Sequence, residues 1–225
     1  RRLYQNDGQE LFEIYRDVAE IGLVTSLDLA AVDAASEAGR VNWRAILERT
    51  LPFVDIFAPS VEELLFMLDR ERFDHLTHEA AGCDLTTVID IEKDVRYLAE
   101  EALFMGAGVV LIKCGEPGLY YRTASEVRIN NIANKLGYPL TGWADRAGFE
   151  PSFVPERVVS ATGAGDVTIA AFLTALLKGF SLERCLLIAT AAGACCVTEH
   201  DSLSGLINFE DMQERIDTGW KKRER

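Results

Sequence analysis

Apolar positions along the chain follow two periods, and each period predicts a different kind of element. Leu11, Ile14, Tyr15 and Val18 recur at helical spacing, so we expect an amphipathic helix over about residues 3–20, already under way where the sequence starts. Short β-branched runs bounded by turn residues predict strands. The expected strands are 24–28, 54–58, 109–113 and 119–122, and the expected helices start at 43 and 61 or cover 92–105, 164–178, 182–198 and a last segment from about 209.

This order of elements predicts an α/β fold. Strands that alternate with helices are typical of βαβ units, in which helices flank a mostly parallel sheet. A length of 225 residues suits one α/β domain, so we expect residues 1–225 to form a single domain. Two stretches lack a clear period: 88–90 is ambiguous between strand and loop, and 130–156 predicts a long loop. Four residues of that loop either contact a ligand or lie on the surface: Trp143, Asp145, Arg146 and Phe149.

Composition and charge exclude several classes of protein. The chain has 23 basic and 36 acidic residues, and a formal net charge of −13 argues against a nucleic-acid surface. No apolar stretch approaches a membrane span and the N-terminus has no signal-peptide pattern, so we expect a cytoplasmic protein without a membrane partner. The cysteines lack paired spacing and are expected to be buried thiols: Cys83, Cys114, Cys185, Cys195 and Cys196.

One short segment has the spacing of a metal site. His75, His78 and Glu79 would share a helix face, and such a face can hold a metal ion. Histidines one turn apart in a polar segment are more often solvated, which is the interpretation we favour.

The segment from Val158 to Asp166 carries the clearest chemical signal. A β-branched start, the run Thr162-Gly163-Ala164-Gly165-Asp166 and an apolar helix are typical of a strand–loop–helix anion site. Glycines let backbone N–H groups approach an anion, and the helix start adds roughly half a positive charge, so a phosphate is the expected ligand. A carboxylate at Asp166 would repel it unless it takes a proton from a hydroxyl that attacks phosphorus. The alternative is a turn that only caps a buried helix.

At these residues the chain resembles the ribokinase-like sugar kinases of the phosphofructokinase-B type, whose signature reads Thr-Gly-Ala-Gly-Asp before a small-residue-rich helix. The resemblance extends over most of the chain, in the family's order. Its further segments are Val24–Asp28, Ala58–Glu63, Val110–Gly115 and Ala189–Ala194. It implies a ribokinase-like, Rossmann-like three-layer sandwich, with the family's N-terminal portion and lid missing from this sequence.

The resemblance also implies site residues. Asp166 would be the catalytic base, and the backbone of Gly163, Ala164 and Gly165 the anion hole for the migrating phosphoryl group. The turn after 110–113 would border the nucleotide phosphates, although Gly118 also suits a plain turn. The helix at 189–194 would pack on the sheet or on an adenine ring. The nucleotide-binding candidates are therefore Thr162, Lys113, Gly115, Gly118, Thr190 and Gly193.

Ser60 and Glu63 allow two interpretations. Ser-x-x-Glu before an apolar helix is a capping box, in which both side chains satisfy free backbone N–H groups. The family instead has Asn-x-x-Glu here, and its glutamate helps hold Mg²⁺ or the water around it. Because Glu63 matches and a hard cation needs oxygen ligands, Glu63 is the metal candidate.

The resemblance implies an ATP-dependent kinase, aided by Mg²⁺, that phosphorylates a hydroxyl of a sugar or sugar-like substrate, and a homodimer is possible. Ser160 stands where many relatives have an aspartate that helps bind a monovalent cation, so that cofactor is doubtful. Nothing matches the family's sugar-binding N-terminal third, so the isolated chain is expected to lack sugar kinase activity. The alternatives are a nucleoside or vitamin-type alcohol kinase and a regulatory module that binds nucleotide without catalysis.

Overall fold

The computed structural model describes residues 3–224, and in it the chain divides into two compact units. The first unit runs from the start of the described chain to Lys113 and adds 120–139 and 144–147. The second unit contains Cys114–Leu119, Leu140–Trp143 and the chain from Gly148 onward. The chain passes between the two units within the strands β4 and β5, so we describe the helices of each unit separately.

Five strands are hydrogen-bonded in the order in which they occur: β1 (Ser26–Leu27), β2 (Ile56–Phe57), β3 (Val109–Lys113), β4 (Gly118–Thr123) and β5 (Ala147–Pro151). The first three are parallel, with Ile56 paired to both Ser26 and Val109. Backbone hydrogen bonds join β4 to β5 in antiparallel register, from Thr123 N–H to Arg146 C=O and from Ser152 N–H to Pro117 C=O. The predicted α/β fold with a mostly parallel sheet is confirmed, and β1 and β2 are shorter than predicted.

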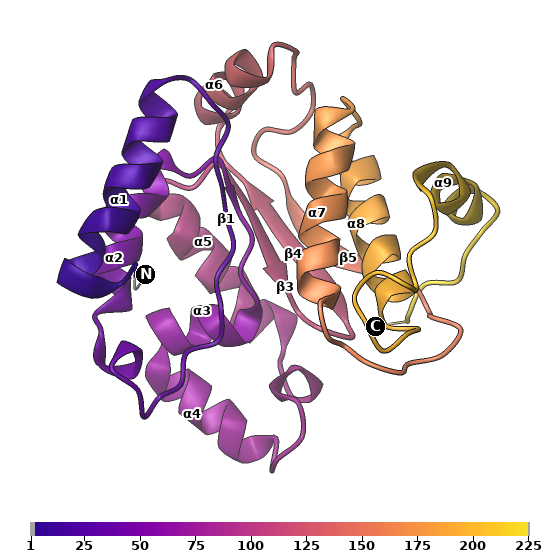
Figure 1. Ribbon diagram of the computed structural model, residues 1–225, viewed down its shortest axis with the longest axis horizontal. Helices are drawn as coiled ribbons and strands as arrows, with labels where there is room; N and C mark the ends of the chain where they lie inside the picture. Colours follow the sequence, from indigo (N-terminus) through magenta and orange to yellow (C-terminus); the bar gives the residue numbers. More distant parts are fainter. Residues whose placement is uncertain (1–2, 225) are drawn as a thin grey trace. The chain divides into compact units, whose positions relative to one another are not determined.

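The helices of the first unit cover the parallel strands. They are α1 (Gln5–Glu20), α2 (Trp43–Thr50), α3 (Val61–Leu68), α4 (Arg70–Glu79), α5 (Arg96–Phe104) and α6 (Glu126–Leu136), with short 3₁₀ turns at Ala38–Arg40, Leu51–Phe53 and Leu85–Thr87 and a π-helical turn at Ile91–Val95. Helices α1 and α2 lie side by side, and α5 packs on β3 (Figure 1). The core between them includes fully buried Leu47, Leu65, Leu98 and Leu111. The predicted helices from 43 and 61 are confirmed.

The prediction of a long loop over 130–156 is wrong, because α6 and β5 occupy much of this range. Ile129, Ile132 and Ala133 follow a helical period and are buried, and Gly137 ends the helix with φ +80°. The Gly, Pro and Asn residues that suggested a loop lie mostly on the exposed face or after the helix. The ambiguous 88–90 forms no strand, and the Asp90 side chain instead accepts the backbone N–H groups of the following turn.

The helices of the second unit are α7 (Ala164–Leu177), α8 (Leu182–Cys196) and α9 (Phe209–Asp217). Figure 1 shows α7 and α8 packed side by side, and both agree with the predicted helices. Gly193 permits this contact, because a Cβ there would lie 2.7 Å from Thr168 Oγ1. Trp143 is buried against Phe172, with ring centroids 6.1 Å apart, so it is a core residue. The expected strand at Val158 is absent, and that residue is exposed.

The structure also tests the predictions for the cysteines and for the segment with metal-site spacing. Cys114, Cys185, Cys195 and Cys196 are buried free thiols as predicted, but Cys83 is exposed, so the prediction is wrong there. His75 and Glu79 form an exposed i,i+4 pair, 3.8 Å apart, in line with a solvated face. Within residues 3–224, no three His, Cys, Asp or Glu side chains gather as metal ligands. Over the same range, no helix is long and apolar enough to cross a membrane.

Candidate active site

In the second unit, the predicted phosphate turn lies at the start of the 14-residue helix α7. Gly163 is its N-cap and has φ +78°, a left-handed conformation that favours glycine. A Cβ at this position would also lie 2.3 Å from the Cβ of Ser202, so the turn leaves no room for a side chain. Glycine is therefore required at position 163 by backbone conformation and by packing together.

Backbone N–H groups at this turn are partly engaged within the protein. Thr162 N–H donates to Ser160 Oγ (3.1 Å) and Ala164 N–H donates to Ala161 C=O (3.1 Å). Within the described chain, the N–H groups of Gly163, Gly165 and Asp166 have no hydrogen-bond acceptor. Unpaired N–H groups at a helix start, with its dipole, form a binding site for an anion. Gly163 and Gly165 thus have the N–H groups that the predicted anion hole requires, whereas that of Ala164 is already engaged.

The Asp166 carboxylate is exposed in the first turn of α7. Behind the turn, Cys196 Sγ lies 3.6 Å from both Thr162 C=O and Ser202 C=O, and its single S–H can donate to either of them. Burial raises the pKa of the Cys196 thiol, and the Asp201 and Asp166 carboxylates raise it further. Cys196 therefore remains a neutral donor that supports the turn, and the exposed carboxylate in the first turn of α7 is that of Asp166.

Three residues of the first unit lie together at the carboxyl ends of the parallel strands: Lys113, Ser60 and Asp28. Lys113 ends β3, its N–H donates to Pro59 C=O (2.9 Å), and it pairs in a parallel bridge with Ser60. Its ammonium contacts both carboxylate oxygens of Asp28, each at 2.6 Å. Ligands of α/β proteins bind at this edge of a sheet. Asp28 was not among the predicted site residues, although its place directly after β1 could have indicated it.

Glu63 is a capping residue, as one of its two interpretations predicted. Its Oε2 accepts Ser60 N–H (2.8 Å), and its own N–H donates to Ser60 Oγ (3.2 Å), which completes a capping box. None of the hydrogen bonds described between residues 3 and 224 uses Oε1. Mg²⁺ keeps several waters and is often bound by one or two carboxylates together with phosphate oxygens. Glu63, with Asp28 on the same strand edge, fits that donor chemistry, and its metal role stays a prediction.

The substitution Glu63→Gln separates the two roles. Glutamine retains an oxygen that can accept Ser60 N–H, so the melting temperature is expected to stay within about 2 °C, as for a cap change worth a few tenths of a kcal/mol. A metal role predicts that more Mg²⁺ is needed for half-maximal activity. The measurement is a Mg²⁺ titration of ATP turnover beside a thermal melt. An unchanged titration would remove Glu63 from the metal site.

Four further candidates, all in the second unit, have structural explanations. Gly115 has φ +64°, which suits a turn, and Gly118 lies so close to β5 that a Cβ would be 2.3 Å from Glu150 C=O. Thr190 is buried, and its hydroxyl donates to Leu186 C=O (3.1 Å) inside α8. Gly193 is needed for the packing of α8 on α7. Their contacts with nucleotide stay predictions.

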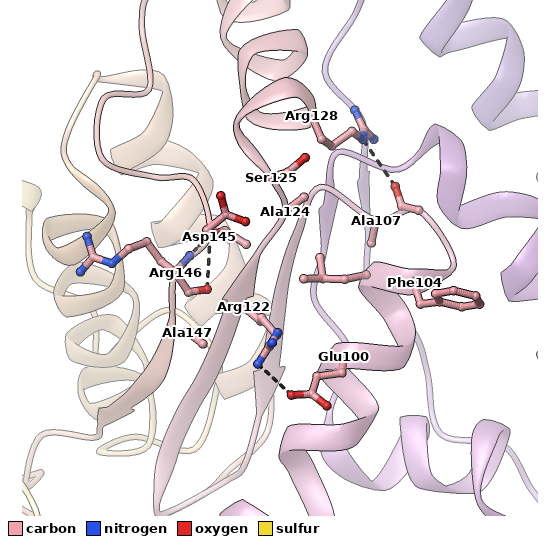
Figure 2. A pocket seen from close by; sticks show the side chains of 13 residues that line it. Glu100, Phe104, Ala107, Arg122, Ala124, Ser125, Arg128, Asp145, Arg146 and Ala147 are labelled. Carbon is pink, nitrogen blue, oxygen red and sulfur yellow. Dashed lines mark hydrogen bonds and ion pairs between the residues drawn. The ribbon is translucent and has the colours of Figure 1, made fainter.

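A cavity of about 610 Å³ in the first unit lies away from the strand edge that carries Lys113. It is lined by the residues before β3 and after β4, at the amino-terminal end of β3, and Asp145 and Arg146 from the predicted loop border it (Figure 2). Arg122 pairs with Glu100 at 3.0 Å, as Figure 2 shows. Asp145 and Arg146 therefore line a surface cavity of mixed polar and apolar side chains and do not belong to the strand edge that carries Lys113.

The fold and the Thr162–Asp166 turn define a class of α/β kinases, and sequence comparison identifies the family. The chain matches the pfkB family of carbohydrate kinases over residues 7–207 and belongs to that family. It is 26% identical over 188 residues to a ribokinase of Arabidopsis thaliana, an alignment that covers 82% of this chain and 37% of that protein. The chain thus spans well under half of the ribokinase's length.

Solved structures agree on the fold. The structure of Arabidopsis thaliana ribokinase complexed with ribose and ATP has a TM-score of 0.59 at 20% identity and is matched over 90% of this chain and 50% of its own. The structure of Burkholderia thailandensis nucleoside kinase in complex with inosine has a TM-score of 0.61 at 16% identity, over 97% of this chain and 55% of its own. At these identities the likeness establishes the ribokinase-type fold alone.

Proposed function

We propose that this chain is the nucleotide-binding and catalytic portion of an ATP-dependent kinase that phosphorylates a hydroxyl of a sugar or sugar-like substrate. The observation that carries the proposal is the start of α7, where the exposed Asp166 carboxylate follows backbone N–H groups that are available to an anion. Membership of the pfkB family supports it. We treat residues 1–225 as one functional domain and infer a cytoplasmic enzyme.

The proposed chemistry needs few protein groups. The Asp166 carboxylate takes the proton of the acceptor hydroxyl, whose oxygen forms a bond to the γ-phosphorus of ATP. The bond from that phosphorus to the bridging oxygen breaks, and its electron pair leaves with ADP. The N–H groups of Gly163 and Gly165 are donors to the oxygens of the phosphoryl group in transit. Most of the rate enhancement then comes from positioning and from charge stabilisation.

The metal ion and the nucleotide phosphates are assigned to residues at the carboxyl ends of the parallel strands in the first unit. Lys113 is the proposed neighbour of the ATP phosphates there. In the second unit, the further nucleotide candidates are Thr162, Gly115, Gly118, Thr190 and Gly193, whose described contacts or backbone conformations also have structural explanations. Glu63 would hold Mg²⁺ or its waters, and the ion would neutralise charge on the phosphates. Ser160 Oγ accepts Thr162 N–H, so its hydroxyl already supports the turn, and a monovalent cation is not part of the proposal.

The acceptor is proposed only as a class, because ribose and inosine occupy two different relatives of this fold. The test uses the enzyme produced from its full coding sequence, with calorimetric ATP binding and a coupled ADP-release assay over sugars and nucleosides. We expect ATP binding and ADP release that depends on a sugar. ADP release with nucleosides alone would favour a nucleoside kinase. ATP binding without turnover on any acceptor would favour a regulatory module, and no ATP binding would overturn the proposal.

A further inference from the structure

Residues 208–223 form a strap on the second unit. Here "the strap" means α9 together with the tail Trp220–Arg223, and it lies after the region 7–207 that matches the family. Asn208 caps α9, since its Oδ1 accepts Asp211 N–H at 2.8 Å. The helix is followed by Gly219 with φ +94°, which turns the chain back. The strap is thus an ordered element with its own start and end signals.

The tail pairs with the residues around the end of β5. Val154 N–H donates to Lys221 C=O and Arg223 N–H donates to Ser152 C=O, both at 2.9 Å. Phe153 and Lys222 form an antiparallel bridge between them. Three successive residues of the tail therefore continue the sheet as a short antiparallel partner.

This pairing places the tail next to the turn that follows β3. Ser152 N–H donates to Pro117 C=O at 3.1 Å, while Ser152 C=O accepts from Arg223. The N–H and C=O of one strand residue point to the same side, so the tail lies on the edge that β4 occupies further along. The Arg223 guanidinium forms an ion pair with Glu116, whose C=O also accepts Ser152 Oγ at 2.5 Å. The turn Gly115–Gly118 is held by the tail through a charge pair.

Aromatic and ionic contacts anchor the strap. The Trp220 ring stacks on Phe153 with centroids 4.8 Å apart, and its Nε1–H donates to Val154 C=O at 2.7 Å. The Arg215 guanidinium also lies over the Trp220 ring, with its Cζ 3.9 Å from the ring centroid. On α9, the two carboxylate oxygens of Asp217 accept from Arg184 of α8 at 2.6 and 3.1 Å. A bidentate pair at the last residue of α9 and a stacked indole in the tail fix the C-terminal half of the strap.

We propose that the strap positions the Gly115–Gly118 turn, with Arg223 as a positioning residue that acts through Glu116. The turn follows β3 directly, and the carboxyl ends of parallel strands are where α/β proteins bind their ligands. The first part of this inference, that the strap orders the turn, stands on the contacts above. The second part, that an ordered turn improves nucleotide binding, rests on the proposed function.

The experiment compares Arg223→Ala with Lys221→Ala in the enzyme from its full coding sequence. Both variants shorten a basic side chain of the tail, but Lys221 is exposed and is paired through its backbone C=O. Hydrogen exchange is measured on peptides that cover 114–119 and 150–154. We expect Arg223→Ala to speed exchange of the Cys114 and Ser152 amides by about 2- to 5-fold, the range of an exposed ion pair, and Lys221→Ala to leave them unchanged. The double variant Glu116→Arg with Arg223→Glu should restore slow exchange.

If the two single variants exchange at equal rates, the inference that the strap orders the Gly115–Gly118 turn is wrong. It is also wrong if the double variant does not restore slow exchange of the Cys114 and Ser152 amides. Trp220→Ala provides a second probe, because removal of the stacked ring should release all three tail pairings and speed exchange at Ser152 and Val154 together. ATP affinity is then measured by calorimetry, with an expected 2- to 5-fold weakening for Arg223→Ala alone. If the exchange rates change as expected but the parent protein does not bind ATP, the inference that the strap orders the turn stands and the proposed function is rejected.

Discussion

Replacement of Asp166 by asparagine is expected to lower kcat by about 10²- to 10⁴-fold, the usual contribution of a general base. Asparagine has nearly the same shape, and the fold at the start of α7 depends on Gly163 and on backbone hydrogen bonds, not on the Asp166 side chain. The melting temperature and ATP affinity should therefore change little. Initial rates at saturating ATP and acceptor, with a melt and an ATP titration on the same preparation, measure the three quantities.

A matched control is available in the second unit. Asp211 occupies the third position of α9, as Asp166 does in α7, so Asp211→Asn makes the same change of charge at the same helical position away from the Thr162–Asp166 turn. Asparagine keeps an oxygen that can accept from Asn208 Nδ2, so the cap of α9 is retained. It should leave kcat within about twofold, as is usual for surface substitutions. Turnover of Asp166→Asn within threefold of the parent would exclude Asp166 as the base. An equal loss in both variants would assign the effect to charge at a helix start.

Local sequence rules predicted those parts of the molecule in which neighbouring residues decide the structure. The β-branched run 109–113 became β3 with the expected bounds, and the Ser60–Glu63 spacing became a capping box. The helix α6 was missed because its buried stripe is only three residues wide and is interrupted by polar Asn and Lys positions. The Gly and Asn residues near the end of α6 favoured the prediction of a loop, although the buried residues follow a helical period. Residue composition was therefore a poorer predictor here than periodicity.

The candidate site was predicted in part for the same reason. The Thr162–Asp166 turn is a contiguous motif, and its glycine at φ +78° is required by the geometry that the motif encodes. The partner of Lys113 could not be found in this way, because Asp28 is joined to it only by the pairing of β1, β2 and β3. The contact between Arg223 and Glu116 also depends on the pairing of distant segments, so no local sequence pattern predicts it.

A cluster of charges in the first unit carries the largest expected effect on stability. The Asp55 carboxylate is fully buried and accepts from Arg128 Nη1 at 2.7 Å, Lys135 Nζ at 2.8 Å and Thr25 N–H at 3.0 Å. Both cations come from α6, and Thr25 directly precedes β1. Arg128 also donates to Val54 C=O at 2.9 Å. One carboxylate therefore joins α6 to the amino-terminal ends of two strands.

Asp55→Ala is expected to lower the free energy of unfolding by about 3–5 kcal/mol, because it leaves two largely buried cations without their anion. The control is Asp74→Ala, which removes the exposed partner of Arg70 in an i,i+4 pair and should cost only about 0.3–0.5 kcal/mol. Urea unfolding of both variants and the parent, monitored by circular dichroism, gives the differences in the free energy of unfolding. One m-value is used for all three proteins. If Asp55→Ala does not express as a folded protein, Asp55→Asn keeps the acceptor for Thr25 N–H and tests the charge alone. A loss below about 1 kcal/mol for either change at Asp55 would show that water replaces the carboxylate, and that the cluster adds little to the stability of the first unit.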